Sequence, residues 1–180
     1  MNNYKSLLVN VEQHVATVTL NRPEIRNAFN DEMIAELTHA FKTLGNDDNV
    51  RVIVLAAAGK AFCAGHNLKE MRAHSYEAFQ RALFQQCSHM MLTINRMPQV
   101  VIAKVQGIAT AAGCQLVAAC DLAVAADEAK FATSGINVGL FCSTPAVAVS
   151  RNLPRKQAFE MLITGEFIAA HTASQYGLIN

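Results

Sequence analysis

Strand-like and helix-like patterns of hydrophobic residues alternate along this chain. Residues 6–11 and 15–20 predict a pair of strands, and the regular alternation of side chains in the second run supports this. Between residues 31 and 44, apolar side chains recur every three or four positions, which is the period of a helix with one buried face, and Gly45 follows as a natural helix end. A continuous apolar run predicts a buried strand at 50–57. The order strand, helix, strand is typical of a parallel sheet.

The second half of the chain predicts further helices separated by short strands. A long helix with one apolar face is predicted at 75–97, and Pro98 ends it. Shorter elements follow: a strand at 122–126, helices at 145–152 and 155–164, and a helical turn at 172–176. After Gly177 the last three residues resemble the opening of another strand. We therefore expect related proteins to continue beyond this point.

The stretch from residue 100 to 121 is the one around which we expect the rest of the chain to be organised. It predicts a buried strand at 100–105 and, after a turn, a helix at 109–120 that is apolar on every side. A helix without a polar face must be enclosed by other elements, so this helix is predicted to be central. The small residues Ala111, Ala112 and Gly113 stand at its first turn, where backbone N–H groups are free and a ligand can approach them.

Length and composition are those of one globular domain. The chain has 180 residues, of which 52% are hydrophobic and 16% charged, so a single domain spanning 1–180 is predicted. A net charge of +1 gives no reason to expect nucleic acid or an anionic membrane as partner, and no apolar run approaches the roughly 18 residues of a membrane span. The first residues show no signal or transit character. We expect a cytoplasmic location, or the mitochondrial matrix if a leader is missing.

The five cysteines lie far apart in the sequence, mostly in apolar surroundings. They are Cys63, Cys87, Cys114, Cys120 and Cys142. An odd number without Cys-x-x-Cys spacing disfavours both a disulfide framework and a zinc site. We predict buried, reduced thiols and no metal centre.

Three motifs, in order, carry a resemblance to a known family. They are N-R-P-x-x-R-N-A at 21–28, F-C-A-G-H-N-L-K-E-M at 62–71, and G-I-A-T-A-A-G-C-Q-L-V-A-A-C-D-L-A-V-A at 107–125. This combination resembles the crotonase (enoyl-CoA hydratase/isomerase) superfamily over essentially the whole chain. The runs at 109–116 and 138–145 resemble one branch of it, the enoyl-CoA hydratase domain-containing protein three group.

This resemblance implies an α/β fold of crotonase type, built as a spiral of ββα units, with an acyl-CoA thioester as ligand. Coenzyme A would be part of the substrate, so no separate cofactor is expected. The resemblance also implies assembly into homotrimers, often paired into hexamers. Family members run on for several more helices that complete the trimer contact, and residues 1–180 do not include these trimerisation helices.

The resemblance further implies which residues meet the ligand. The backbone N–H groups of His66 and Ala112 would donate to the thioester oxygen as it becomes negative, and the helix start at Ala112 adds positive potential. Coenzyme A would be held by residues of two loops and the helix start: Ile25, Arg26, Ala28, Ala64, Gly65, His66, Leu68, Lys69 and Gly113. Arg26 and Lys69 either meet the phosphates or stay solvated. The His66 imidazole either faces the acyl pocket, or packs and caps Asn67.

The sequence departs from the family pattern at the two positions that carry catalytic Glu in hydratases. Those positions are Gln115 and Gly135 here. A Gln can orient water by hydrogen bonds but cannot take a proton near neutral pH, and Gly supplies only backbone. Efficient hydration is therefore not expected. Cys142 stands in a segment that could border the pocket, but no base occupies an obvious position beside it.

Two main hypotheses about function remain open at this point. The first is an enzyme of fatty acid metabolism that acts on acyl-CoA thioesters, in which Gln115 and His66, or an ordered water, replace the missing bases. The second is a non-catalytic acyl-CoA-binding protein or subunit of the same fold. A third alternative is a fragment that folds poorly without the trimerisation region.

Overall fold

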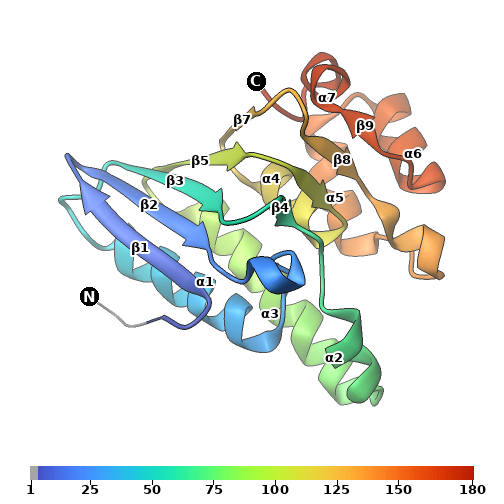
Figure 1. The fold of residues 1–180 in the computed structure, drawn as a ribbon, viewed down its shortest axis with the longest axis horizontal. Coiled ribbons are helices and arrows are strands. Elements are labelled where there is room, and N and C mark those ends of the chain that lie inside the picture. Colours follow the sequence, from blue (N-terminus) through green and yellow to red (C-terminus); the bar gives the residue numbers. More distant parts are fainter. Residues whose placement is uncertain (1–3) are drawn as a thin grey trace.

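Two β-sheets form the framework of the protein. The computed structural model describes residues 4–180. The larger sheet has the order β1 (Leu7–Glu12), β2 (Val15–Leu20), β3 (Val52–Ala57), β5 (Val100–Val105) and β7 (Leu122–Ala125) (Figure 1). The smaller sheet has the order β4 (Ala61–Cys63), β6 (Ile108–Thr110), β8 (Lys130–Ala132) and β9 (Ile168–Ala169). Only the pairs β1–β2 and β8–β9 are antiparallel. The predicted parallel arrangement is therefore confirmed.

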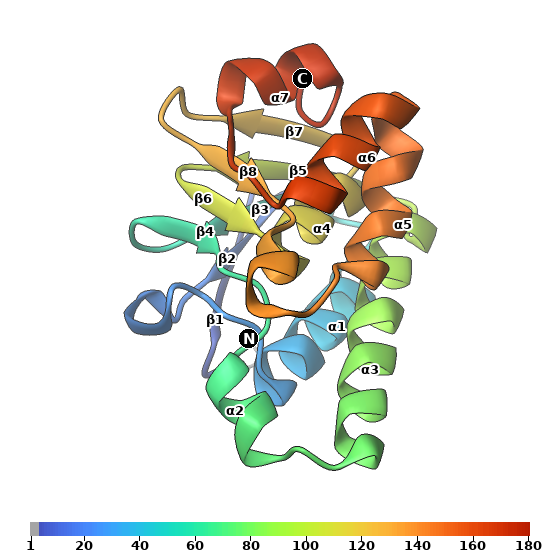
Figure 2. The ribbon, with the colours of Figure 1, turned by 90° about the vertical axis from the view of Figure 1, so that its right-hand side faces the viewer.

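Helices cover one face of the larger sheet and surround the smaller one. α1 (Asp31–Gly45) and α3 (Glu77–Arg96) pack side by side beneath the larger sheet (Figures 1 and 2). The other helices are α2 (Leu68–Ala73), α4 (Ala112–Ala119), α5 (Ser143–Asn152), α6 (Arg155–Thr164) and α7 (Ala170–Tyr176), with short 3₁₀ turns η1 (Pro23–Ile25) and η2 (Ser134–Val138). Every residue of α4 is buried, and this helix packs against β4, β6, α3 and α5. The expectation of an enclosed central helix is confirmed.

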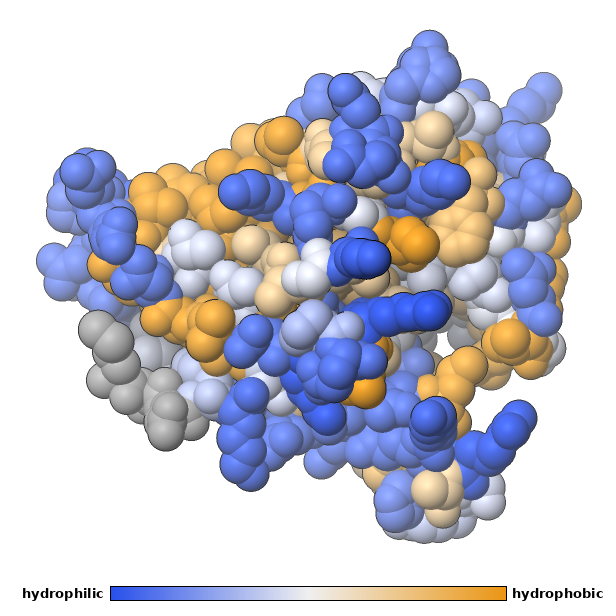
Figure 3. All heavy atoms as spheres, viewed as in Figure 1, coloured by the Kyte–Doolittle hydropathy of each residue, from blue (hydrophilic) through white to orange (hydrophobic). Residues whose placement is uncertain are grey.

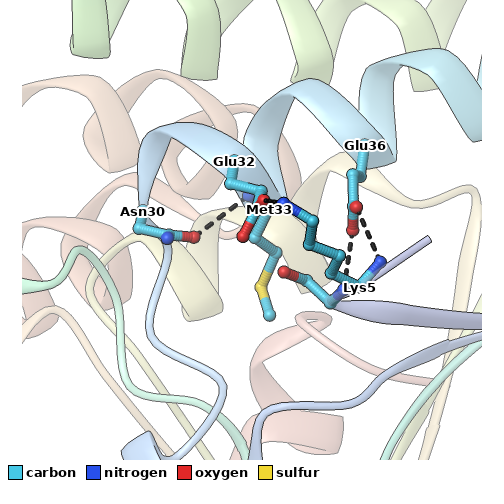
Figure 4. A network of polar contacts seen from close by, with 6 residues as sticks. Lys5, Asn30, Glu32, Met33 and Glu36 are labelled. Atoms are coloured by element: carbon cyan, nitrogen blue, oxygen red, sulfur yellow. Dashed lines mark hydrogen bonds and ion pairs between the residues drawn. The ribbon is translucent and has the colours of Figure 1, made fainter.

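The start of α1 is tied to the N-terminal strand by polar contacts (Figure 4). The Asn30 side chain accepts the Met33 N–H at 3.0 Å, as a helix N-cap does. The Glu36 carboxylate accepts the backbone N–H groups of Lys5 and of the next residue, both at 2.8 Å, and the Lys5 ammonium meets Glu32 at 2.8 Å. These contacts set where β1 begins relative to α1.

The outward face of the larger sheet carries exposed apolar side chains. In Figure 3 hydrophobic residues form a band over these strands. Its exposed members include Val15 on β2, Val100 on β5, and Leu122 and Val124 on β7. A sheet with one uncovered face alternates buried and exposed positions along each strand, which explains the alternation read in residues 15–20.

The shortest elements differ from the sequence-based expectation. β4, β6, β8 and β9 have only two or three residues each, so no period could identify them. The helix expected from residue 109 begins at Ala112, because the three residues before 111 form β6. The prediction that the last three residues open another strand was wrong, because residues 178–180 form no strand. Instead, the Asn180 N–H donates to the Ala123 carbonyl at 2.9 Å, and the Asn180 side chain accepts the Ala123 N–H at 2.9 Å.

All five cysteine side chains are buried, as predicted. Within residues 4–180, no helix is both long and apolar enough to cross a bilayer. In the same part of the chain, no three His, Cys, Asp or Glu side chains gather closely enough to hold a metal ion.

A close backbone approach fixes α4 against β4. A Cβ atom on Gly113 would lie only 2.1 Å from the Cys63 carbonyl oxygen and 2.9 Å from the Cys63 Cβ. Atoms cannot approach this closely, so only glycine allows the first turn of α4 to touch β4. This contact brings the start of α4 next to the loop that follows β4.

We therefore expect the substitution Gly113→Ala to lower the free energy of unfolding by about 3 kcal/mol or more, because backbone atoms must move apart. Gly45→Ala is the matched control. A Cβ on Gly45 would meet nothing closer than 3.6 Å, so this change should stay within about 1 kcal/mol of the wild type. Urea denaturation followed by circular dichroism measures both. Equal stability of the two variants would contradict the proposed close packing.

Candidate active site

A cavity of about 700 Å³ lies where several loops and helix ends meet. In Figure 3 it opens at the right-hand side, between α2 and residues 134–145, and Figure 2 faces this side of the molecule. Its wall is formed by Ile25, Arg26, Ala64, His66, Leu68, Lys69, Met71, Phe84, Ala111, Ala112, Ser134, Gly135, Val138, Leu140, Phe141, Cys142, Ser143, Thr144 and Pro145. The lining is largely apolar, and it contains no Asp or Glu.

One wall is a loop that Asn27 anchors. This side chain is fully buried, and its amide accepts the Arg22 N–H at 2.8 Å while donating to the carbonyls of Ala58 and Ala61, both at 2.9 Å. Arg26 and Asn27 both have left-handed backbone conformations, with φ of 56° and 52°. Asn tolerates this conformation better than most residues. The amide contacts hold the loop that carries Arg26 against the ends of β3 and β4.

A second wall is joined to the first by strand-like pairing. The Phe29 N–H donates to Gly65 O at 2.7 Å, and the Asn67 N–H donates to Phe29 O at 2.7 Å. In such a parallel bridge, the N–H of the intervening residue, His66, points away from Phe29. A Cβ on Gly65 would lie 3.4 Å from the Ala112 nitrogen. The backbone at Gly65 and His66 therefore lies directly beside the start of α4.

The start of α4 combines free N–H groups with a strained backbone. Ala111, which precedes the helix, has φ of 50° and ψ of −119°, and its N–H donates to Ala132 O at 3.0 Å. A non-glycine residue in this region costs on the order of 1–3 kcal/mol, and such strain clusters at functional sites. No side chain caps this helix, so its first N–H groups and the positive end of its dipole face the cavity at Ala112.

The His66 side chain packs among aromatic rings at the cavity wall. Its ring centroid lies 5.2 Å from that of Phe84 and 6.2 Å from that of Phe29, both in edge contacts. Its Nε2 is buried and has no hydrogen-bond partner among the described residues. Burial lowers the pKa of the imidazole from 6.5 to about 4, so the ring is neutral at physiological pH. Asn67 itself caps α2, accepting the Lys69 N–H at 3.1 Å.

The two positions that lack carboxylates differ in their surroundings. Gln115 is 5% exposed, lies one helical turn after Ala112 on the same face of α4, and leaves its Oε1 without a partner among residues 4–180. Gly135 lines the cavity beneath a folded loop. A Cβ on Gly135 would lie 2.3 Å from Leu140 O and 2.8 Å from Cys142 Sγ. The loop therefore leaves no room for a side chain at this position.

Cys142 is the one cysteine among the lining residues. Burial raises the pKa of its thiol, although a hydrogen bond from the Gly135 backbone opposes this. The thiolate is the reactive form of cysteine. A nucleophilic role for Cys142 therefore has no electrostatic support.

The structure brings most of the predicted site residues together. The cavity is lined by Ile25, Arg26, Ala64, His66, Leu68, Lys69 and Ala112. Ala28, Gly65, Gly113 and Gln115 are not part of the lining and lie behind it. Sequence analysis missed the apolar part of the wall: Met71, Phe84, Val138, Leu140 and Phe141. Met71 and Phe84 lie on α2 and α3, and the other three lie in residues 134–145, so only the tertiary arrangement of these segments brings them to one wall.

Comparisons with known proteins agree with this architecture. A model of the enoyl-CoA hydratase/isomerase family matches residues 10–180. The chain is 48% identical over 169 residues to the Xenopus laevis protein named enoyl-CoA hydratase domain-containing protein 3, mitochondrial, covering 94% of this chain and 58% of the frog protein. The chain spans a little over half the length of this frog protein and of the Danio rerio and human proteins of the same name.

Solved structures match over nearly the whole chain. A Mycobacterium smegmatis enoyl-CoA hydratase is 60% identical with a TM-score of 0.95, over 97% of this chain and 68% of that one. Human enoyl Coenzyme A hydratase domain-containing protein 3 is 43% identical with a TM-score of 0.95, over 98% of this chain and 70% of that one. These matches confirm the predicted crotonase-like α/β fold.

The lowered pKa of His66 predicts a specific pH dependence of stability. The unfolded chain takes up a proton at this ring below about pH 6.5, whereas the folded protein does so only near pH 4. The unfolding free energy should therefore fall as pH drops from about 6.5 to 4, by on the order of 3 kcal/mol from this residue. The variant His66→Phe should lose this part of the pH dependence.

The control for that measurement is His171→Gln, because His171 is exposed on α7. Chemical denaturation at a series of pH values compares the three proteins. If His66→Phe and His171→Gln show the same pH slope, the ring of His66 is not buried in neutral form.

Proposed function

Because this chain belongs to the enoyl-CoA hydratase/isomerase family, we propose that it binds acyl-CoA thioesters in the cavity and stabilises negative charge on the thioester oxygen. One observation carries this proposal: the backbone beside His66 and the free start of α4 at Ala112 meet at one cavity wall. Two N–H groups aimed at one oxygen form an oxyanion hole, and removal of a single such donor typically costs about 3–4 kcal/mol of transition-state stabilisation.

The rest of the thioester fits the remaining walls of the cavity. Arg26 and Lys69 supply positive charge for the phosphates of coenzyme A, while the carbonyl and N–H groups of the two loops hold its uncharged parts. The acyl chain lies against the apolar wall that includes Phe84 and Phe141. This arrangement accounts for a ligand that is anionic at one end and apolar at the other.

Efficient hydration is not part of this proposal. The Gln115 amide cannot accept a proton, and Gly135 has no space for a side chain. His66 lines the cavity, but a base whose pKa is about 4 removes protons poorly at neutral pH. An enzyme of fatty acid metabolism remains the first candidate function, with His66 or a water positioned by Gln115 moving protons slowly.

The second candidate is a non-catalytic acyl-CoA-binding protein or subunit. The loop folded over Gly135 favours it, because this loop closes the place where a second carboxylate would stand. The homotrimer or hexamer implied by the resemblance stays a prediction. The frog relative is mitochondrial by its name, whereas the cytoplasmic location expected for this chain stays a prediction.

The test is titration with crotonyl-CoA and with a non-reactive thioether analogue, followed by a turnover assay on the same sample. Binding with hydration supports the enzyme, and binding without reaction supports the carrier. The variant Ala112→Val should weaken binding of the thioester about tenfold, because its added methyl groups crowd the proposed oxygen site. Its affinity for free coenzyme A and its melting temperature are the controls. Unchanged thioester affinity would refute the placement of the donor.

The double variant Gln115→Glu with Gly135→Glu should not gain crotonyl-CoA hydration. A side chain at residue 135 must displace the loop that carries Leu140, and a buried, unpaired Glu at residue 115 costs several kcal/mol. We expect a lower melting temperature and no increase in product. A clear rise in hydration with unchanged stability would show that only the two bases are missing.

A further inference from the structure

We propose that the hydroxyl groups of Thr110 and Ser134 form a hydrogen-bond acceptor site in this cavity, which selects an acyl group with a hydroxyl on its third carbon. The inference rests on the proposed function, because it concerns the acyl end of the same thioester. It gives roles to two residues that the proposed function does not use: Ser134 contacts the ligand, and Thr110 positions Ser134.

The two hydroxyls lie at the same edge of the smaller sheet as the proposed oxygen site. β6 and β8 are parallel neighbours, and Thr110 is paired with Ala132 in their register. Two residues beyond this pair the chain reaches Ala112 after β6 and Ser134 after β8, and both residues belong to the cavity lining. Neighbouring strands lie about 4.8 Å apart. Ser134 is therefore placed about one strand spacing from the free N–H group of Ala112.

A hydrogen bond of 2.7 Å joins the Ser134 and Thr110 hydroxyls. Thr110 is 8% exposed and is not part of the lining, whereas Ser134 is half-buried and lines the cavity. A serine side chain has no heavy atom beyond its hydroxyl oxygen, so a ligand that touches this side chain meets the hydroxyl. Thr110 therefore acts on a ligand only through Ser134.

The positions of the two protons follow from the oxygen atoms around Thr110. Its Oγ1 lies 3.2 Å from the Ala132 carbonyl oxygen, which has no proton of its own. The Thr110 proton must point to Ala132, because two oxygens at this distance repel each other without a proton between them. The Ser134 proton then occupies the 2.7 Å contact with Thr110. Only lone pairs of Ser134 remain for the cavity, so this hydroxyl accepts a hydrogen bond from a ligand.

The backbone on both sides of this pair is held by hydrogen bonds. The Ala111 N–H donates to the Ala132 carbonyl at 3.0 Å, and the Leu140 N–H donates to the Gly135 carbonyl at 2.9 Å. An acceptor that is already held in place loses little conformational freedom when a ligand binds. A single hydrogen bond at Ser134 can therefore distinguish one ligand from another.

The site selects both the position and the kind of group on the acyl chain. When the thioester oxygen meets the Ala112 N–H, a substituent on the third carbon extends to Ser134, whereas an oxygen on the second carbon stays closer to the thioester oxygen. A hydroxyl donates a hydrogen bond to Ser134, but a ketone has no proton to donate. A site built around a substrate hydroxyl discriminates against analogues that lack it.

This role differs from that of the missing carboxylates. Neither the Thr110 hydroxyl nor the Ser134 hydroxyl takes up a proton near neutral pH. The pair therefore selects the ligand and does not supply the absent bases at residues 115 and 135.

The test compares 3-hydroxybutyryl-CoA with acetoacetyl-CoA, which carries a ketone at the same carbon, with 2-hydroxybutyryl-CoA and with butyryl-CoA. Isothermal titration should give 3-hydroxybutyryl-CoA an affinity about tenfold higher than that of each of the others, because it alone donates a hydrogen bond to Ser134. Equal binding of acetoacetyl-CoA, 2-hydroxybutyryl-CoA or butyryl-CoA would overturn this inference and leave the proposed function standing. If no thioester binds, the proposed function fails and this inference fails with it.

Three variants separate the two roles. Ser134→Ala should lose the preference for 3-hydroxybutyryl-CoA over butyryl-CoA, while the affinity for butyryl-CoA stays within about twofold. Thr110→Val keeps the shape of the side chain but removes the oxygen that holds the Ser134 proton, so this proton can turn to the cavity. We expect this variant to bind acetoacetyl-CoA and 3-hydroxybutyryl-CoA within about twofold of each other. Thr110→Ser restores the oxygen and should restore the preference.

Thr133→Val is the matched control for these variants. Thr133 is the neighbour of Ser134 in the chain, and its buried hydroxyl donates to Met161 O at 2.6 Å outside the cavity lining. This control should lower the melting temperature and keep the affinity ratios of the wild type. If Ser134→Ala keeps the preference, or Thr133→Val loses it to the same extent, Ser134 is not the acceptor. Unchanged ratios in Thr110→Val would overturn the positioning role of Thr110.

Discussion

The contact between Gly113 and the Cys63 carbonyl is the constraint on which the rest of this structure depends. α4 has no polar face, so it must be enclosed, and it becomes enclosed by pressing its first turn directly onto β4. That approach is possible only without a Cβ atom. Because the loop after β4 carries His66, the same contact sets the start of α4 beside it. Core packing and the geometry of the cavity therefore have one common cause.

The polarity of the candidate site comes mainly from backbone groups. Ala111 holds a strained conformation at the start of α4, and Asn27 is buried so that the loop around Arg26 stays in place. Neither residue needs a reactive side chain for this role. Backbone donors held by packing do not reorient when a charge develops beside them, which is why such sites stabilise anions well. The cavity combines this capacity with a lining that contains no Asp or Glu.

The segment from residue 134 to 145 distinguishes this cavity more than any single side chain does. It folds over Gly135, supplies the apolar wall, and directs the start of α5 inward. The cavity thus lies between two helix starts, with two positive side chains and no negative one in its lining.

The sequence by itself determined the long elements, the family and part of the cavity lining, such as Arg26 and His66. Helices such as Asp31–Gly45 and strands such as Val100–Val105 show their period or apolar length directly, because each spans enough residues to repeat it. The sequence also showed that residues 115 and 135 lack carboxylates. Only the tertiary structure decided which side chains share the cavity, such as Phe84 and Phe141, and whether the His66 ring is buried. These properties depend on contacts between segments far apart in the chain, and no local pattern records such contacts.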